Sequence, residues 1–207
     1  MSGNKYTSMF IVLEGIDGCG KTTQARKLAD WLRGQQKQAF LTMEPTGGKI
    51  GVFLRQILAG EEKVDPQTLA LLFTADRVEH LRTEVEPALA QGKIVISERY
   101  AHSTIAYQAA QGVDRDWIMS INSFAPNPDV TFYLDVDPTM GAGRSDRAEI
   151  FENAAFLAKV REEYLRMTDY LTVVDASKTA DEVFLEIKSK LSQALADQAN
   201  PVEKAED

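Results

Sequence analysis

Short apolar runs alternate along the chain with longer segments in which apolar residues recur every three or four positions. The runs have the length of buried strands and predict strands over residues 10–13, 39–42, 94–96, 130–134 and 171–174. The segments between them predict helices over residues 25–32, 50–59, 66–90, 102–111, 114–124, 152–168 and 180–196. Strands that alternate with helices predict an α/β fold with a five-stranded, mainly parallel sheet flanked by helices in three layers.

The organisation of the chain is simple at this level. It shows no internal repeat and no linker, so we expect a single domain over residues 1–207. Residues 1–8 and 197–207 are polar, and we expect both ends to be flexible. The segment 141–151 begins with two glycines and a small residue, which is the composition of a hinge, and we expect a short mobile lid there.

Charge and composition narrow the classes of function. Lys and Arg number 23 against 31 Asp and Glu, and a net charge of -8 argues against nucleic-acid binding as the main task. The chain has no stretch of 18 apolar residues and no signal-peptide layout, so we expect no membrane partner. The single cysteine, Cys19, cannot form an internal disulfide, and a reducing cytoplasm is the expected compartment.

Residues 15–22 have the sequence G-I-D-G-C-G-K-T, which satisfies the phosphate-binding pattern G-x-x-x-x-G-K-[ST] between a predicted strand and a predicted helix. The glycines let backbone N–H groups turn toward phosphate oxygens, and the start of the helix adds positive potential. Lys21 is expected to reach the β- and γ-phosphates of ATP, and the Thr22 hydroxyl to ligate Mg²⁺. The expected ATP contacts are Gly15, Ile16, Asp17, Gly18, Cys19, Gly20, Lys21, Thr22 and Thr23.

A second acidic residue at the end of a buried strand usually organises the metal in such proteins, and two candidates exist. Glu98 follows one predicted strand and Asp135 follows another, and spacing alone does not decide between them. Glu98 is followed at once by Arg99, which places a carboxylate beside a phosphate-binding cation and favours Glu98. We interpret Asp135 as a residue that caps the turn over 136–138.

The pattern of arginines favours a kinase among nucleotide-binding proteins. No N-K-x-D guanine motif occurs, and large motor ATPases need a longer chain. Phosphoryl transfer between two anions needs positive charge to offset repulsion and stabilise the transition state. Candidate cations follow strands or lie on predicted helices at Arg55, Arg77, Arg99, Arg144, Arg147 and Arg161. We interpret Arg161 as a solvated charge on a helix face.

Further motifs follow in order along the chain. Glu14 and Asp17 flank the phosphate-binding loop. They are followed by E-P at 44–45, L-F-T-A-D-R at 72–77, E-R-Y at 98–100, S-T-I-A-Y-Q at 103–108, P-D-V-T-F-Y-L-D-V at 128–136, and Glu152, Phe156, Arg161 and Tyr164. In this order, from about residue 9 to 195, the chain resembles the thymidylate kinase family of P-loop nucleoside monophosphate kinases. The resemblance implies transfer of the γ-phosphate of ATP to dTMP with Mg²⁺, and a homodimer.

The resemblance also implies roles for individual residues in binding the base and the sugar. The thymine ring would stack on Phe73, Arg77 would bond a base carbonyl, and Thr104 would contact the base edge. Tyr107 would crowd a ribose 2′-hydroxyl. The complete set implied to contact dTMP is Asp17, Glu44, Pro45, Arg55, Phe73, Arg77, Arg99, Thr104, Tyr107 and Gln108.

Roles at the phosphates follow from the same resemblance. Arg99 with Arg55 would hold the acceptor phosphate. The residues near the metal would be Thr22, Glu98 and Asp17, the last two also close to the sugar 3′-hydroxyl.

Two departures from the family pattern affect the catalytic residues. Gly18 stands where one branch of the family carries a catalytic arginine, so that charge is expected from the lid. The usual lid position falls on Ile150, and the nearby Arg144 and Arg147 are the remaining candidates. The other departure is Glu98 in place of the commoner aspartate. The expected catalytic residues are Lys21, Arg99, Glu98, Asp17, Arg147 and Arg144.

Two alternatives stay open at this level. One is a kinase for a different acceptor, such as a deoxynucleoside, dUMP or UMP/CMP. The other is a regulatory ATPase that hydrolyses ATP slowly and signals through the lid. ADP formation that depends on added dTMP would distinguish a kinase from such a regulator.

Overall fold

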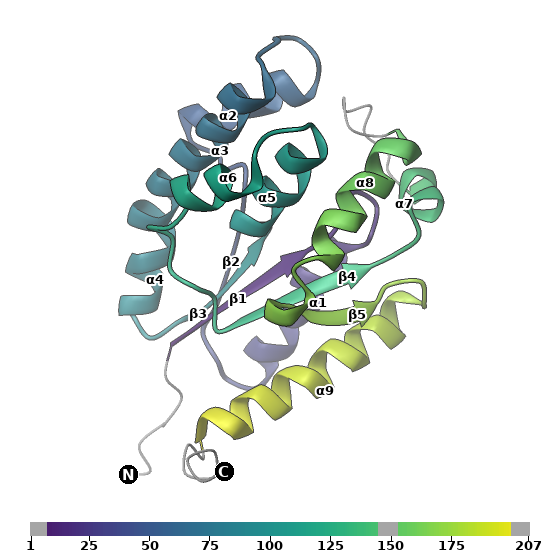
Figure 1. Cartoon of the computed structure of the whole chain (residues 1–207). Helices are drawn as coiled ribbons and strands as arrows, with labels where there is room; N and C mark the ends of the chain where they lie inside the picture. The colour runs from purple at the N-terminus through teal and green to yellow at the C-terminus, as the bar shows by residue number, and fades with distance from the viewer. Residues whose placement is uncertain (1–7, 145–152, 200–207) are drawn as a thin grey trace, which may run out of the picture.

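A five-stranded parallel sheet forms the centre of the computed structural model, which describes residues 8–144 and 153–199, with side chains up to 141 and 193 in these two ranges. The strand order is β2-β3-β1-β4-β5 (Figure 1). The strands are β1 (Met9–Glu14), β2 (Ala39–Met43), β3 (Ile94–Glu98), β4 (Val130–Asp135) and β5 (Thr172–Asp175). The five predicted strands and the α/β class are confirmed.

Helices cover both faces of this sheet (Figure 1). They are α1 (Lys21–Gly34), α2 (Lys49–Leu58), α3 (Pro66–His80), α4 (Glu86–Ala90), α5 (Ala101–Ala110), α6 (Arg115–Ile121), α7 (Pro138–Arg144), α8 (Ala154–Leu165) and α9 (Ala180–Ala199). A π-helical turn, η1 (Leu81–Val85), joins α3 to α4, and a 3₁₀ turn, η2 (Thr168–Tyr170), follows α8. The helix predicted over 66–90 is therefore one run with a π-turn inside it.

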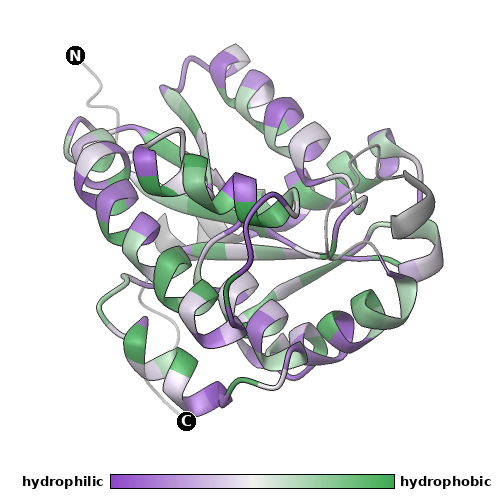
Figure 2. Ribbon diagram, turned by 90° about the horizontal axis from the view of Figure 1, so that it is seen from above, coloured by the Kyte–Doolittle hydropathy of each residue, from purple (hydrophilic) through white to green (hydrophobic). Residues whose placement is uncertain are grey.

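The alternation of side chains along β1 explains why this strand is continuously apolar. Ile11 and Leu13 point into a large core that includes Leu28 of α1, whereas Val12 packs on the other face with Val85 of η1. A central parallel strand is buried on both faces, so polar alternation is absent from it. Figure 2 shows hydrophobic residues along the central strands and hydrophilic residues interspersed over the surrounding helices.

The parallel arrangement places the functional loops at one edge of the sheet. β1 pairs with both β3 and β4, and Leu13 lies opposite Glu98 in the register. On the far side of β3, Met43 of β2 also lies opposite Glu98. The loops that follow β1, β2 and β3 therefore meet at the carboxyl ends of the strands, where open α/β sheets bind their ligands.

The segment expected to be a lid begins as a helix. The Asp137 side chain accepts hydrogen bonds from the backbone N–H (2.9 Å) and the hydroxyl of Thr139, and α7 runs from there to Arg144. Residues 141–144 of the predicted lid are therefore helical, because this cap starts a helix in the glycine-containing stretch, and the mobility of the lid stays a prediction. The rest of the predicted lid, 145–151, lies outside the described residues.

The C-terminal part of the chain is helical further than we expected. Helix α9 continues to Ala199, into the tail that we expected to be flexible, and residues 1–7 and 200–207 lie outside the described ranges. Over 8–144 and 153–199, every helix is too short or too polar to cross a bilayer. The single domain over 1–207 stays a prediction.

Candidate active site

The phosphate-binding loop connects β1 to α1 and leaves backbone donors available. Gly20, the residue before α1, adopts φ 95° and offers no side chain to the first N–H groups of the helix. These groups and the positive end of the helix dipole make a site for anions. Lys21 is buried, and its Nζ donates to the carbonyl oxygens of Gly15 (3.0 Å) and Ile16 (2.8 Å). The predicted ATP contacts thus form one continuous loop and the first turn of α1.

Backbone atoms of the loop and of α7 touch each other at two glycines. A Cβ atom on Gly18, which has φ +75°, would lie 1.9 Å from the carbonyl oxygen of Gly141. A Cβ atom on Gly141 would in turn lie 2.7 Å from the carbonyl oxygen of Asp17. An arginine at position 18, as in the other branch of the family, therefore does not fit this arrangement.

Thr22 and Glu98, two of the predicted metal-side residues, are in direct contact. The Thr22 hydroxyl lies 2.9 Å from each carboxylate oxygen of Glu98. A hydroxyl and a carboxylate are hard oxygen ligands that suit Mg²⁺, and both face the same cleft. The residues present therefore fit a metal held between the loop and β3.

Asp135 has a different partner from the one that we expected. Arg161 of α8 forms a two-fold ion pair with it, Nε to Oδ1 at 2.6 Å and Nη2 to Oδ2 at 2.8 Å, and the Tyr133 hydroxyl adds a bond of 3.0 Å. The hydrogen bond from Arg161 lowers the pKa of Asp135 below its usual value. The interpretations of Asp135 as a turn cap and of Arg161 as a solvated charge are both wrong, because β4 and α8 bring them together and Asp137 caps the turn.

Asp17, Arg99 and Tyr107 form a compact cluster between the loop and α5. Arg99 donates to Asp17 through Nη2, and the Tyr107 hydroxyl donates to the other carboxylate oxygen at 2.9 Å. Burial opposes ionisation of Asp17, yet the charges of Arg99 and Lys21 lower its pKa to about 2. Arg99 itself has φ 68°, a conformation that costs a non-glycine residue about 1–3 kcal/mol.

Glu14, at the end of β1, fixes the start of α5 and was missed as a positioning residue. Its fully buried carboxylate accepts from the backbone N–H groups of Tyr100 (2.8 Å) and Ser103 (3.2 Å) and from the hydroxyls of Ser103 (2.5 Å) and Tyr164 (2.8 Å). A negative charge at a helix N-terminus is stabilising. The available signal was an acidic residue directly after an otherwise apolar strand.

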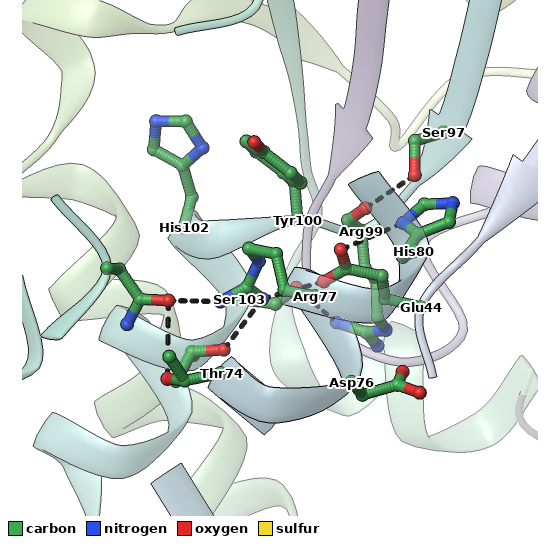
Figure 3. A network of polar contacts seen from close by, with 12 residues as sticks. Glu44, Thr74, Asp76, Arg77, His80, Ser97, Arg99, Tyr100, His102 and Ser103 are labelled. Atoms are coloured by element: carbon green, nitrogen blue, oxygen red, sulfur yellow. Dashed lines mark hydrogen bonds and ion pairs between the residues drawn. The ribbon is translucent and has the colours of Figure 1, made fainter. Parts of the chain in front are cut away.

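The end of the cleft that the resemblance implies for the base contains Arg77, which is almost fully buried. Arg77 donates to Glu44 (2.7 Å), to the Thr104 hydroxyl (3.0 Å) and to the Asn122 side chain (Figure 3). Phe73 is half-buried one turn earlier on α3. The structure therefore brings Arg77, Thr104 and Phe73 to one place, as the resemblance implied.

A cavity of about 460 Å³ joins these parts. It is lined by all ten residues implied to contact dTMP: Asp17, Glu44, Pro45, Arg55, Phe73, Arg77, Arg99, Thr104, Tyr107 and Gln108. Thr22 and Glu98 line it as well. The lining residues that we did not predict are Arg26, Met43, Gly47, Leu58, Tyr100 and Ser103. Arg26 could have been found, because it lies four positions after Thr22 on the same helix face.

The predicted lid arginines cannot be placed in this cleft. Arg147 and the side chain of Arg144 lie outside the described residues. Their catalytic role stays a prediction. Within the ranges that the structure describes, His, Cys, Asp and Glu form no group of three or more suited to hold a metal by themselves.

A glycine-rich anion-binding loop on a parallel sheet, next to a cation-lined cleft of nucleotide size, defines a P-loop nucleotide kinase and hence a phosphotransferase. The family model described as "Thymidylate kinase" matches residues 13–187. Two similar proteins, from Pyrobaculum calidifontis and Methanococcus aeolicus, are both named "Probable thymidylate kinase". They are 45% and 44% identical over 194 residues, covering 91% and 88% of this chain and 98% and 95% of their own. The chain belongs to the thymidylate kinase family.

Proposed function

We propose that the protein transfers the γ-phosphate of ATP to dTMP and forms dTDP and ADP. The observation that carries the proposal is that one cleft is lined by ten residues from separate segments of the chain, all implied by the family motifs. This cleft also contains Thr22 and Glu98, so an acceptor in it would face the phosphate-binding loop. Substrate and donor would then meet between the loop and α5.

The acceptor is held at its two ends by different groups. The thymine ring stacks on Phe73, and Arg77, which also lines the cleft, donates to a base carbonyl. The acceptor phosphate lies against Arg99 and Arg55, both of which line the cleft. Arg55 already donates to the carbonyl oxygen of Pro45 (3.0 Å), which orients it toward the cleft.

Catalysis relies on positive charge placed around the transferred group. Lys21 supplies one charge from inside the loop. Mg²⁺ would be held by Thr22 and Glu98, with Asp17 nearby, and would neutralise negative charge on the phosphates. A further charge comes from Arg144 or Arg147 in the proposed lid.

We further propose a homodimer in the cytoplasm. Exposed apolar side chains occur on α2 (Val52 and Phe53), α3 (Leu71) and α6 (Met119), and α3 contacts both of the other helices. Such side chains are typical of a surface that a second copy covers. Sedimentation of the protein with and without a Leu71→Glu substitution tests this, because the substitution should shift the dimer toward monomer.

A coupled assay of ADP formation over a panel of nucleoside monophosphates tests the function. The expected order places dTMP first, with dUMP, UMP, CMP and AMP behind it. More efficient use of CMP or AMP would overturn the acceptor. ATP turnover that ignores every monophosphate would indicate a regulatory ATPase instead.

A further inference from the structure

Arg77 at the base-binding end is held by a chain of polar groups that extends away from the cleft. Its Nη2 donates to Glu44, and its Nη1 donates to Asn122, whose own Nδ2 donates to the carbonyl oxygen of Ile118 (2.9 Å). Each partner is itself buried. The direction of the guanidinium therefore depends on how rigidly Glu44 and Asn122 are held.

Glu44 is held in turn by His80. One carboxylate oxygen accepts from Arg77 at 2.7 Å, and the other lies 3.0 Å from Nδ1 of His80. Figure 3 shows Glu44 between the two side chains. His80 is fully buried and does not line the cleft, so it acts on a ligand only through Glu44.

Each ring nitrogen of His80 faces a hydrogen-bond partner. Nδ1 lies 3.0 Å from a carboxylate oxygen of Glu44, and Nε2 lies 2.8 Å from the Thr42 hydroxyl. The same hydroxyl donates to the carboxylate of Glu84 at 2.6 Å. The ring is therefore held on both sides, with Nδ1 in place to donate to Glu44.

Acidic and basic side chains alternate along this network in the order Arg77, Glu44, His80 and Glu84. Glu84 is the member with access to solvent, at 38% side-chain exposure. The π-turn that begins at Leu81 follows His80 directly and carries Glu84. Such turns are frequent at functional sites.

We propose that His80 is a positioning residue for recognition of the base: its Nδ1–H fixes Glu44, and Glu44 fixes Arg77 so that the guanidinium can donate to a base carbonyl. This inference deepens the proposed function and rests on it. A base with an amino group in place of that carbonyl would place its own N–H donors against the N–H donors of Arg77, and no hydrogen bond could form. Firm positioning of Arg77 therefore sets discrimination between dTMP and dCMP.

The test compares His80→Leu with His80→Asn and uses the other histidine of the chain, in His102→Asn, as a matched control. His80→Leu removes the donor to Glu44, and we expect dTMP affinity by calorimetry to fall about 10- to 100-fold. The preference for dTMP over dCMP should narrow while the KM for ATP stays near the parent value. His80→Asn places its amide N–H where Nδ1 stood and should recover most of the preference, and the control should match the parent.

Further outcomes distinguish failure of the His80 proposal from failure of the proposed function. A folded His80→Leu enzyme with the parent's dTMP affinity and dCMP discrimination would overturn it. If that variant does not fold, ¹H–¹⁵N spectra of the parent decide, because an Nδ1 without a proton could not donate to Glu44 and would overturn the proposal. Failure of the parent itself to bind dTMP would instead contradict the proposed function.

Discussion

The two ends of the cleft are built by different means. The phosphate end is a loop of consecutive residues, 15–22, which presents backbone N–H groups and one lysine. The end proposed to bind the base, called the base end below, is assembled from Glu44, Arg77, Thr104 and Asn122. These residues come from four separate segments and meet only as buried side chains. A phosphate can be bound by backbone geometry alone, whereas a base needs side-chain groups held in one orientation.

The energetic consequences of the two constructions also differ. Breaking a buried pair such as Arg77–Glu44 typically costs about 3–5 kcal/mol, because it leaves a charge without a partner. An exposed pair such as Lys178–Glu186 contributes little, because solvent screens it. Substitutions at the base end should thus affect affinity and folding together, while replacement of Lys21 at the phosphate end should mainly affect turnover.

The largest effect is expected from Lys21→Ala. Loss of the ammonium inside the loop should lower kcat by about 10³-fold or more, because its charge acts on the transferred group. Affinity for dTMP should change little. A fall in kcat without a fall in dTMP affinity would show that the two ends of the cleft have separate roles. Lys27→Ala is the control, since Lys27 lies on the same helix, does not line the cleft, and contacts Asp181 and the Phe184 ring. A kcat for Lys21→Ala close to the control value would contradict the assignment.

A comparison of Gly18→Ala with Gly20→Ala tests the contact between the loop and α7. Both glycines have positive φ, but a Cβ atom at Gly20 meets nothing within 4 Å, whereas one at Gly18 meets Gly141 at 1.9 Å. Both substitutions carry backbone strain of about 1–3 kcal/mol. Gly18→Ala should lower the free energy of unfolding by about 1–3 kcal/mol more. Equal losses in denaturant titrations would mean that the glycine contact is dispensable.

The ionisation of Asp17 predicts a measurable dependence of stability on pH. Its pKa is about 2 in the folded protein against an ordinary value of 3.8, so its contribution is fully present above pH 3.8 and is lost as the pH falls through 2. The difference corresponds to about 2 kcal/mol. The free energy of unfolding of the parent should therefore fall more steeply than that of Asp17→Asn between pH 4 and pH 2. Parallel curves would show that Arg99 does not stabilise the carboxylate.

The smallest effect is expected at the sugar. Tyr107 is buried, and its ring should leave no space for a ribose 2′-hydroxyl. Tyr107→Ala should narrow the preference for dUMP over UMP by about tenfold, at some loss of activity. Tyr107→Phe keeps the ring and should keep the preference, which separates exclusion by shape from the hydroxyl bond to Asp17. An unchanged ratio in a folded Tyr107→Ala enzyme would contradict the role.

Much of the fold could be predicted from the sequence, and the reasons are local. The strands were found because each is a short apolar run between turn residues, and the loop over 15–22 because its pattern and both flanks agree. Glu98 was preferred over Asp135 from its neighbour Arg99, and it lies beside Thr22 in the cleft. Helix 138–144 was missed because its glycines outweighed the cap by Asp137.

The pairs that hold the site together depend on the tertiary structure. Glu14 with Ser103, Asp135 with Arg161, and Glu44 with His80 each join residues more than 20 positions apart, and no spacing rule links such partners. By itself the sequence determined the order of strands and helices and the phosphate-binding loop, because hydrophobic periodicity and backbone geometry act between near neighbours. Which charged side chains are buried against which partners was decided only by packing, because a buried charge is stable only where the fold brings an opposite group to it.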